Sequence, residues 1–165
     1  MFKKILIRSL MLFLVHLNFA QETKKEINQI IKKWAAPNEF PDHVILSATS
    51  DPSRSIAVNW RTDSGNTEGY LEIAEAGPGP DFTIKSKAYP AIRTIINTSQ
   101  VTRDGFKSSF FEARVNQLKP NTLYAYRVGN DNFKSEWHQF TTASDQPSPL
   151  SFLYVGDAQN YILEL

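Results

Sequence analysis

Apolar residues recur at every second position in several short runs between Pro41 and Thr142. In one of these runs, Ile56, Val58 and Trp60 alternate with small or polar residues. A period of two separates side chains onto the two faces of a strand, whereas an amphipathic helix repeats every 3.6 residues. Short runs of this kind, divided by turns, are typical of a two-sheet β-sandwich of about seven strands. We therefore predict a mainly β fold for residues 41–142.

Glycine, proline, aspartate and asparagine mark the breaks between these runs. Asp51-Pro52 and Gly65-Asn66 are turn signals. Gly77-Pro78-Gly79-Pro80 is a stronger break, because neither residue type continues a β-ladder well. Residues 82–104 give weaker signals, and Pro90 restricts its neighbourhood to a sheet edge. The predicted strands comprise residues 43–49, 55–61, 70–76, 94–97, 110–115, 122–129 and 136–142.

Residues 1–20 have the pattern of a secretory signal peptide. Lys3, Lys4 and Arg8 precede an apolar stretch, and Ala20 offers a small residue at the expected cleavage point. The stretch is shorter than the roughly 20 residues of a membrane-spanning helix, which favours cleavage over an uncleaved anchor. We expect export to the periplasm, the cell surface or the extracellular space, with no membrane span after cleavage.

Residues 22–36 are expected to form a short amphipathic helix. Ile27, Ile30, Ile31 and Trp34 follow helical spacing, and Pro37 ends the pattern. We expect this helix to pack on the domain that follows, and a helix lying on a membrane surface is the alternative.

The composition excludes several classes of function. Eighteen Lys and Arg against seventeen Asp and Glu give a net charge of +1, which argues against a nucleic-acid partner. The absence of cysteine excludes a disulfide framework, a thiolate zinc site and a thiol nucleophile. His43 is expected on the surface of a strand, and His138 lies in the last predicted strand with no assigned role. The aromatic residues expected in the core are Trp60, Phe110, Phe111 and Phe140.

A change of pattern follows the sandwich region. Residues 143–150 are rich in serine and proline and predict a linker. Residues 151–155 then form a compact apolar run, as in a strand buried on both faces, and Gly156-Asp157 follows directly. Residues 158–165 can begin a helix, so 151–165 read as the start of a βα unit.

The segment from Leu118 to Gly129 is the most specific local pattern in the sandwich region. Leu118 and Pro120 turn the chain between sheets, and Tyr124 can bury its ring while its hydroxyl reaches a nearby backbone group. This constellation resembles the fibronectin type III-like domain, which is an architectural signal without catalytic meaning.

A wider set of segments resembles the N-terminal domain of purple acid phosphatases and the first strand of the metallophosphoesterase domain that follows it. In that family the first catalytic strand ends in Gly-Asp-x-Gly, and Gly156-Asp157-Ala158-Gln159 stands at the corresponding place. The matching segments, in order along the chain, are residues 41–44, 56–62, 118–129, 140–142 and 152–159.

The resemblance implies hydrolysis of phosphate monoesters at a binuclear metal centre, with iron paired with zinc, manganese or a second iron. Asp157 matches the first metal ligand of the family, the aspartate that holds the trivalent iron. Gln159 replaces the usual glycine, and we assign it no ligand role because a neutral amide binds metals poorly. The family's later motifs Gly-Asp-x-x-Tyr, Gly-Asn-His and Gly-His-x-His do not follow.

We therefore expect residues 151–165 to be the truncated start of a calcineurin-like metallophosphoesterase domain. One carboxylate cannot hold two metal ions, so the chain alone is expected to be inactive and to bind no metal tightly. Its catalytic residues are unknown. The rival interpretation is a free-standing fibronectin-like module for binding or adhesion at the cell surface, in which Asp157 would be a turn residue or helix N-cap. Whether the protein forms a homodimer stays open.

Overall fold

The structure is a computed structural model that describes residues 21–26, 29, 36–98, 105–147, 149, 151 and 153–155. Residues 21–26 and 29 are helical and exposed, at the start of the predicted amphipathic helix. The predicted signal peptide, the whole predicted apolar face of that helix (Ile27, Ile30, Ile31 and Trp34), Asp157 and Gln159 lie outside the described residues. No helix within the described residues combines the length and hydropathy needed to cross a membrane.

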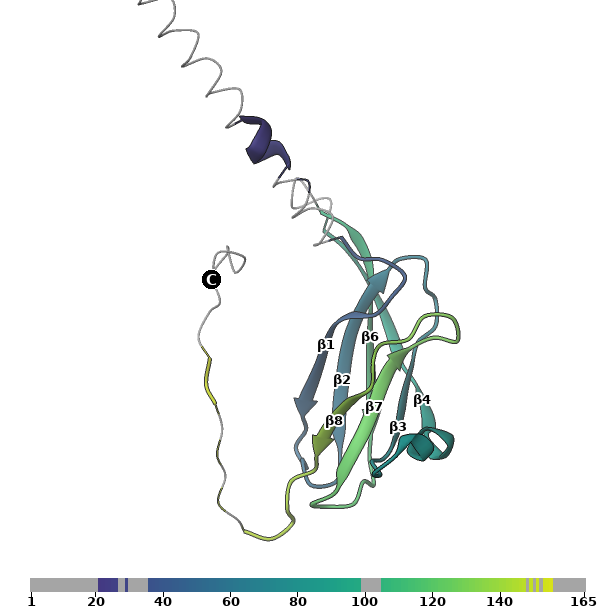
Figure 1. The fold of residues 1–165 in the computed structure, drawn as a ribbon, viewed down its shortest axis with the longest axis vertical. Helices are drawn as coiled ribbons and strands as arrows, with labels where there is room; N and C mark the ends of the chain where they lie inside the picture. The colour runs from purple at the N-terminus through teal and green to yellow at the C-terminus, as the bar shows by residue number, and fades with distance from the viewer. Residues whose placement is uncertain are drawn as a thin grey trace, which may run out of the picture.

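Two four-stranded sheets pack face to face and confirm the predicted mainly β sandwich (Figure 1). The strand order is β1-β2-β6-β5 in one sheet and β4-β3-β7-β8 in the other, and every paired strand is antiparallel. The first sheet consists of β1 (Asp42–Ala48), β2 (Ile56–Asp63), β5 (Ile92–Asn97) and β6 (Lys107–Val115). The second consists of β3 (Tyr70–Glu75), β4 (Lys87–Pro90), β7 (Leu123–Gly129) and β8 (His138–Thr141).

The region around residues 82–104, where the sequence signals were weak, contains a strand that was not predicted and most of a short helix. After the Gly-Pro break, residues Pro80–Lys85 form the 3-10 helix η1, and β4 follows as an edge strand. Pro90 is the last residue of β4, where its missing N–H interrupts no central ladder, as the sequence predicted. Six residues of 3-10 helix and four of strand are too short to produce a clear period, so neither was anticipated.

The core lies between the two sheets. It is built mainly from the apolar residues that recur at every second position of the strands. Trp60 of β2 and Phe111 of β6 are register partners, with their rings stacked at a centroid distance of 5.4 Å. Both are almost fully buried, in keeping with their predicted core positions. The other buried members of this cluster are Ile56, Val58, Leu71, Ile73, Ala113, Val115, Leu118, Tyr124, Tyr126 and Val128.

The core prediction was wrong for Phe110. Successive residues of a strand point to opposite faces, so the two adjacent phenylalanines cannot both enter the core. Phe111 enters it, while Phe110 is half-buried beside Arg61 and Thr94 on the outer face of the first sheet. Phe140, also expected in the core, is partly buried and stacks on Tyr124 at 5.7 Å.

The predicted tyrosine corner is present. The backbone N–H of Lys119 donates a hydrogen bond of 2.9 Å to the Tyr124 hydroxyl, while the Tyr124 ring is buried. The hydroxyl thus finds the backbone partner that burial requires. Gln117 and Asn121 in the same corner adopt left-handed backbone conformations, with φ of 63° and 47°. This hydrogen bond and these two backbone conformations define the connection between the end of β6 and the start of β7.

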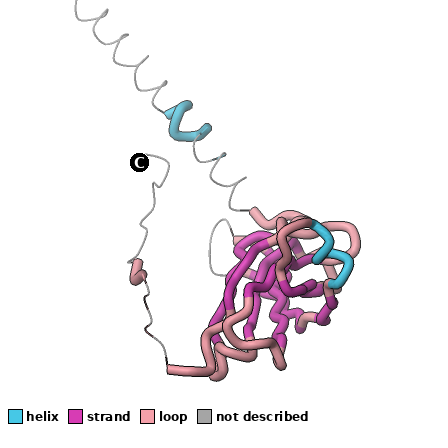
Figure 2. The backbone as a smooth tube through the Cα atoms, turned by 60° about the horizontal axis from the view of Figure 1, so that its bottom comes forward, coloured by secondary structure: helices cyan, strands magenta, loops and turns pink. Residues whose placement is uncertain are grey.

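Beyond the sandwich, the described residues 149, 151 and 153–155 lie apart from the sheets in two views (Figure 1, Figure 2). They form no strand, although the sequence predicted one at 151–155. Leu153 and Tyr154 are each 87% exposed. A strand of this apolar type needs neighbouring strands to cover both of its faces, and the described part of the chain brings none to it.

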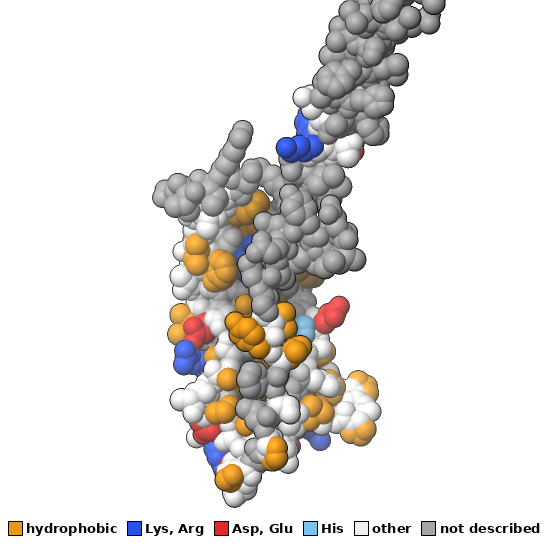
Figure 3. Space-filling model, turned by 90° about the vertical axis from the view of Figure 1, so that its left-hand side faces the viewer, with side chains coloured by type: hydrophobic (Ala, Val, Ile, Leu, Met, Phe, Trp, Pro, Cys, Tyr) orange, Lys and Arg blue, Asp and Glu red, His pale blue; other side chains and the backbone are white. Residues whose placement is uncertain are grey.

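The β1 edge of the sandwich faces the viewer in Figure 3, which shows hydrophobic side chains scattered among polar ones. Ile45 and Leu46 of β1 contribute to the exposed apolar surface. The pairing of this edge strand with β2 is irregular between Asp42 and Ile45, where His43 has a positive φ of 50°. Such irregularities discourage edge-to-edge association of sheets.

Candidate functional site

The described residues hold no cluster of three or more aspartate, glutamate or histidine side chains that could bind a metal ion. Asp157, the predicted ligand, lies outside them, so its surroundings are not tested. His43 is exposed, as predicted, with Nδ1 3.1 Å from Oδ1 of Asp42. His138 begins β8, and its ring lies 5.4 Å from that of Tyr126. These residues do not fit a binuclear metal site, and no metal-dependent step is derived from them.

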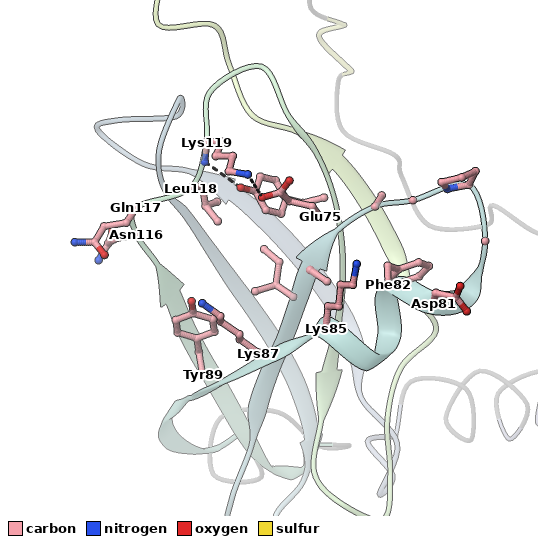
Figure 4. Close-up of a pocket in the computed structure, with 17 residues that line it drawn as sticks. Glu75, Asp81, Phe82, Lys85, Lys87, Tyr89, Asn116, Gln117, Leu118 and Lys119 are labelled. Atoms are coloured by element: carbon pink, nitrogen blue, oxygen red, sulfur yellow. Dashed lines mark hydrogen bonds and ion pairs between the residues drawn. The ribbon is translucent and has the colours of Figure 1, made fainter.

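The described part of the chain does contain a cleft, with a volume of about 700 Å³ (Figure 4). Two separate segments form its walls. Residues 73–89 contribute the end of β3, the Gly-Pro loop, η1 and the start of β4, while residues 116–119 and Tyr124 contribute the corner between β6 and β7. Buried side chains of Ile73, Leu118 and Tyr124 make its apolar floor. We call this hollow the corner cleft.

Charged and polar side chains surround the mouth of the corner cleft (Figure 4). Lys119 forms an ion pair of 2.7 Å with Glu75, and the hydrogen bond to Glu75 raises the pKa of Lys119, which keeps it protonated. Lys85 from η1 and Lys87 from β4 are exposed and form no ion pair within the described residues. Asp81 is the second carboxylate of the lining, so lysines exceed carboxylates around this cleft.

The helix η1, which forms one wall of the corner cleft, is held in place by contacts with the outer face of the second sheet. None of its residues is buried, and its N-terminus has no side-chain cap. Phe82 of η1 instead packs edge-on against Trp137, with ring centroids 5.1 Å apart. The guanidinium of Arg127 stacks on the same Trp137 ring at 4.6 Å, a geometry that a cation–π interaction favours. Trp137 therefore joins η1 to the outer face of the second sheet.

Arg127 in turn belongs to an ionic network centred on Glu72. Arg127 Nη2 lies 2.7 Å from Oε2 of Glu72, and Lys134 Nζ lies 2.5 Å from Oε1. Partial burial alone would raise the pKa of Glu72, but the hydrogen bonds and charges of Lys134 and Arg127 outweigh it and hold the pKa below its ordinary value. The Glu72 carboxylate is thus ionised, and each of its two oxygens contacts one of the two cations.

Glu72→Gln is expected to destabilise the domain by about 1–2 kcal/mol at pH 7, because it removes the charge that two cations share. A lowered native pKa stabilises the fold above the ordinary glutamate value of 4.5, and this contribution is lost as the pH falls through the native pKa. The difference between wild type and variant should therefore shrink between pH 7 and pH 3 in urea unfolding.

The matched control for this variant is Glu75→Gln. Its pair with Lys119 is more exposed, with side-chain exposures of 49% and 68%. Solvent screens an exposed pair and weakens its contribution, so Glu75→Gln should have a smaller effect at either pH. A difference for Glu72→Gln that is as large at pH 3 as at pH 7 would contradict the assignment of the network.

The sequence analysis predicted the tyrosine corner, but it did not predict the corner cleft beside it. The Leu118–Tyr124 pattern is local, whereas the cleft joins residues about thirty to forty positions apart. Lys85 and Lys87 fall in the stretch with weak signals, and nothing in their local sequence indicates what they face. The Gly-Pro loop was the available signal, since a conspicuous break between strands often forms the wall of a site.

The two antiparallel sheets, with a tyrosine hydroxyl bound to the backbone between strands, define a fibronectin type III-like domain. The family model described as the purple acid phosphatase N-terminal domain matches residues 41–142. The chain therefore belongs to the purple acid phosphatase N-terminal domain family.

The chain was also compared with solved structures. The fibronectin type III domain of human contactin 1 is 22% identical, with a TM-score of 0.45, and the match covers 69% of this chain and 86% of that one. For astrotactin-2, described as a vertebrate-specific perforin-like membrane protein, the identity is 14% and the TM-score 0.44, over 66% of this chain and 23% of that one. Among proteins with curated descriptions, none matches the chain.

Proposed function

We propose that this chain supplies the N-terminal domain of an exported metallophosphoesterase of the purple acid phosphatase type, which hydrolyses phosphate monoesters. The observation that carries the proposal is the family match over residues 41–142, followed by an apolar run that ends at Gly156-Asp157. This dipeptide stands where the family has its first metal-binding motif. The sandwich packs against the catalytic domain and shapes the entrance for the substrate.

Asp157 is the residue of this chain proposed to take part in the chemistry. A carboxylate directly after a buried parallel strand projects into the crevice where α/β sheets bind ligands, and Gly156 allows close backbone approach there. When bound, a pair of metal ions supplies Lewis-acid polarisation of the phosphoryl group and activation of a water nucleophile. One carboxylate cannot hold two metal ions, so the remaining ligands of the proposed centre have to come from other segments of the catalytic domain.

The first experiment is to sequence the DNA downstream of codon 165. In-frame segments encoding Gly-Asp-x-x-Tyr, Gly-Asn-His and Gly-His-x-His, in that order, are expected. The complete product, loaded with iron and with zinc or manganese, should then hydrolyse p-nitrophenyl phosphate. If these motifs occur in no reading frame, or if the loaded product has no phosphatase activity, the proposal is wrong.

Two matched variants of the complete product test the role of Asp157. Asp157→Asn should lower kcat/KM by more than about tenfold, since even outer-sphere changes at metal centres reach that size. Asp145→Asn makes the same chemical change in the predicted linker, where the side chain forms an exposed ion pair of 3.0 Å with Arg54. It should leave kcat/KM unchanged. Equal effects of the two substitutions would remove Asp157 from the metal centre.

The second candidate function is a free-standing binding or adhesion module at the cell surface. The corner cleft favours it, because the cleft is complete within the sandwich and needs no catalytic domain. A stop codon after codon 165 with no phosphatase motif downstream would support this alternative over the first.

A further inference from the structure

We propose that the corner cleft binds a sugar-sized organic anion, with Lys85 and Lys87 supplying the positive charge that attracts its acidic group and the apolar floor contacting its body. The cleft lies within the sandwich, and the inference does not depend on phosphatase activity of a longer product. Three properties of the cleft carry it: surplus positive charge, a mixed apolar and polar lining, and walls that are fixed before any ligand arrives.

The charge favours an acidic ligand. The Glu75–Lys119 pair is internally neutralised, whereas Lys85 and Lys87 form no ion pair within the described residues. These two lysines come from consecutive elements, η1 and β4, and both line the cleft, Lys85 on its η1 side and Lys87 beside Tyr89 (Figure 4). An acidic group in the cleft would interact favourably with the charge of either lysine. Asp81, which lies on η1 beyond Lys85 and away from Lys87 in Figure 4, disfavours a ligand with a second negative charge on that side.

The lining favours a small body with both apolar and hydroxyl-bearing surfaces. A volume of about 700 Å³ falls in the range of sites for small organic molecules. Buried Ile73 and Leu118 offer apolar contact, and the half-buried Tyr89 offers an aromatic wall with a hydroxyl. The rim residues Asn116 and Gln117 carry amide groups that both donate and accept hydrogen bonds. A sugar that carries a carboxylate or a phosphate combines these properties.

The walls are preorganised by contacts already described. The Phe82–Trp137 contact holds η1, and the hydrogen bond from Lys119 N–H to the Tyr124 hydroxyl holds the corner. Gln117, on the rim, keeps a left-handed backbone with φ of 63°, which costs energy for a residue other than glycine and is frequent at binding sites. Because ordering costs weaken binding, fixed walls raise affinity for a small ligand.

Gly77 and Gly79 leave the loop side of the cleft open. A Cβ atom added at either position would meet no atom within 4 Å. Gly79 has an extended backbone, with φ of −140° and ψ of −179°, which any residue can adopt. A larger side chain at Gly79, which lines the cleft, can therefore be added without straining the fold and fills open space on the loop side. This position gives a blocking variant that is independent of the lysines.

The binding test is an NMR titration of the 15N-labelled full chain with three probes: glucuronate, glucose 6-phosphate and glucose. Backbone signals of Lys87, Gln117 and Lys119 should shift with at least one of the two acids and stay in place with neutral glucose. The two acids distinguish a carboxylate from a phosphate as the acidic group. Raising the salt concentration from 0.05 to 0.5 M should weaken binding, because these charges are exposed to solvent (Debye length about 10 Å at 0.1 M).

Variants then separate the cleft from the rest of the surface. K85A/K87A should raise the Kd about fivefold, the effect of losing two exposed charge contacts, and Gly79→Leu should raise it by blocking the space. Lys107→Ala is the matched control, because Lys107 begins β6 at the end remote from the corner, and it should leave the Kd unchanged. Circular dichroism of each variant checks that the sandwich is intact.

Several outcomes would overturn the proposal. These are no signal shifts with either acid, equal shifts with glucose, and an unchanged Kd in both K85A/K87A and Gly79→Leu. In those cases the lysines would serve only as solvated charges near an edge strand, where they discourage association between sheets. Phosphatase activity of the complete product is measured separately, so either proposal can fail while the other stands.

Discussion

Phe111→Ala is expected to lower the free energy of unfolding by about 3–5 kcal/mol, which is the range for removing a buried phenylalanine. Phe111 is 2% exposed, and its ring stacks on Trp60 in the centre of the core. Its removal leaves a cavity and strips the Trp60 ring of its partner. Because a domain of this size has a total stability of about 5–15 kcal/mol, the urea midpoint followed by Trp fluorescence should fall substantially.

The matched control is its neighbour Phe110, which has the same chemistry on the opposite face of β6. Phe110→Ala removes a half-buried ring from the outer surface and should cost about 1 kcal/mol or less. The two variants differ by one residue in position and by the face on which the ring lies. Similar costs for both would show that β6 does not have the register in which Trp60 pairs with Phe111.

These two phenylalanines also show how far the sequence determines the fold. The alternation in residues 55–61 placed the β2 core residues correctly, because polar residues mark its other face. Around β6 the chain reads Ser-Ser-Phe-Phe-Glu, in which an apolar pair removes that contrast. The choice between the two faces is made by pairing with β2 and β5. That information comes from distant segments and is absent from the local pattern.

The same distinction applies to the candidate sites. Tyr124 could be placed in a tyrosine corner from sequence because its hydrogen-bond partner is five residues away. The corner cleft could not be predicted, since Lys85 and Lys87 come to line one cleft with Gln117 only after the two sheets have assembled. Asp157 was identified from its family resemblance and remains a prediction, because it lies outside the described residues. Features formed by residues close together in the sequence could therefore be predicted, whereas surfaces formed by distant segments could not.

Gly129→Ala is expected to destabilise the domain by about 3 kcal/mol or more, the cost of a strained backbone together with a steric clash. Gly129 ends β7 with φ of +144°, a conformation that is essentially restricted to glycine. An added Cβ would lie 2.1 Å from the carbonyl oxygen of Phe133. That oxygen accepts a hydrogen bond of 2.9 Å from the N–H of Asn130, so it cannot move away without opening the turn.

Gly79→Ala provides the comparison that isolates this strain. Its Cβ would meet no atom within 4 Å, and its backbone is extended, so the loss of glycine flexibility in the unfolded chain should leave stability unchanged or raise it by up to about 1 kcal/mol. Thermal and urea unfolding of the two variants should therefore shift in different directions or by clearly different amounts. Equal, small effects would mean that the turn after β7 can relax around a side chain. The bridge between Gly129 and Lys134, and with it the position of Lys134 beside Glu72, would then not depend on glycine.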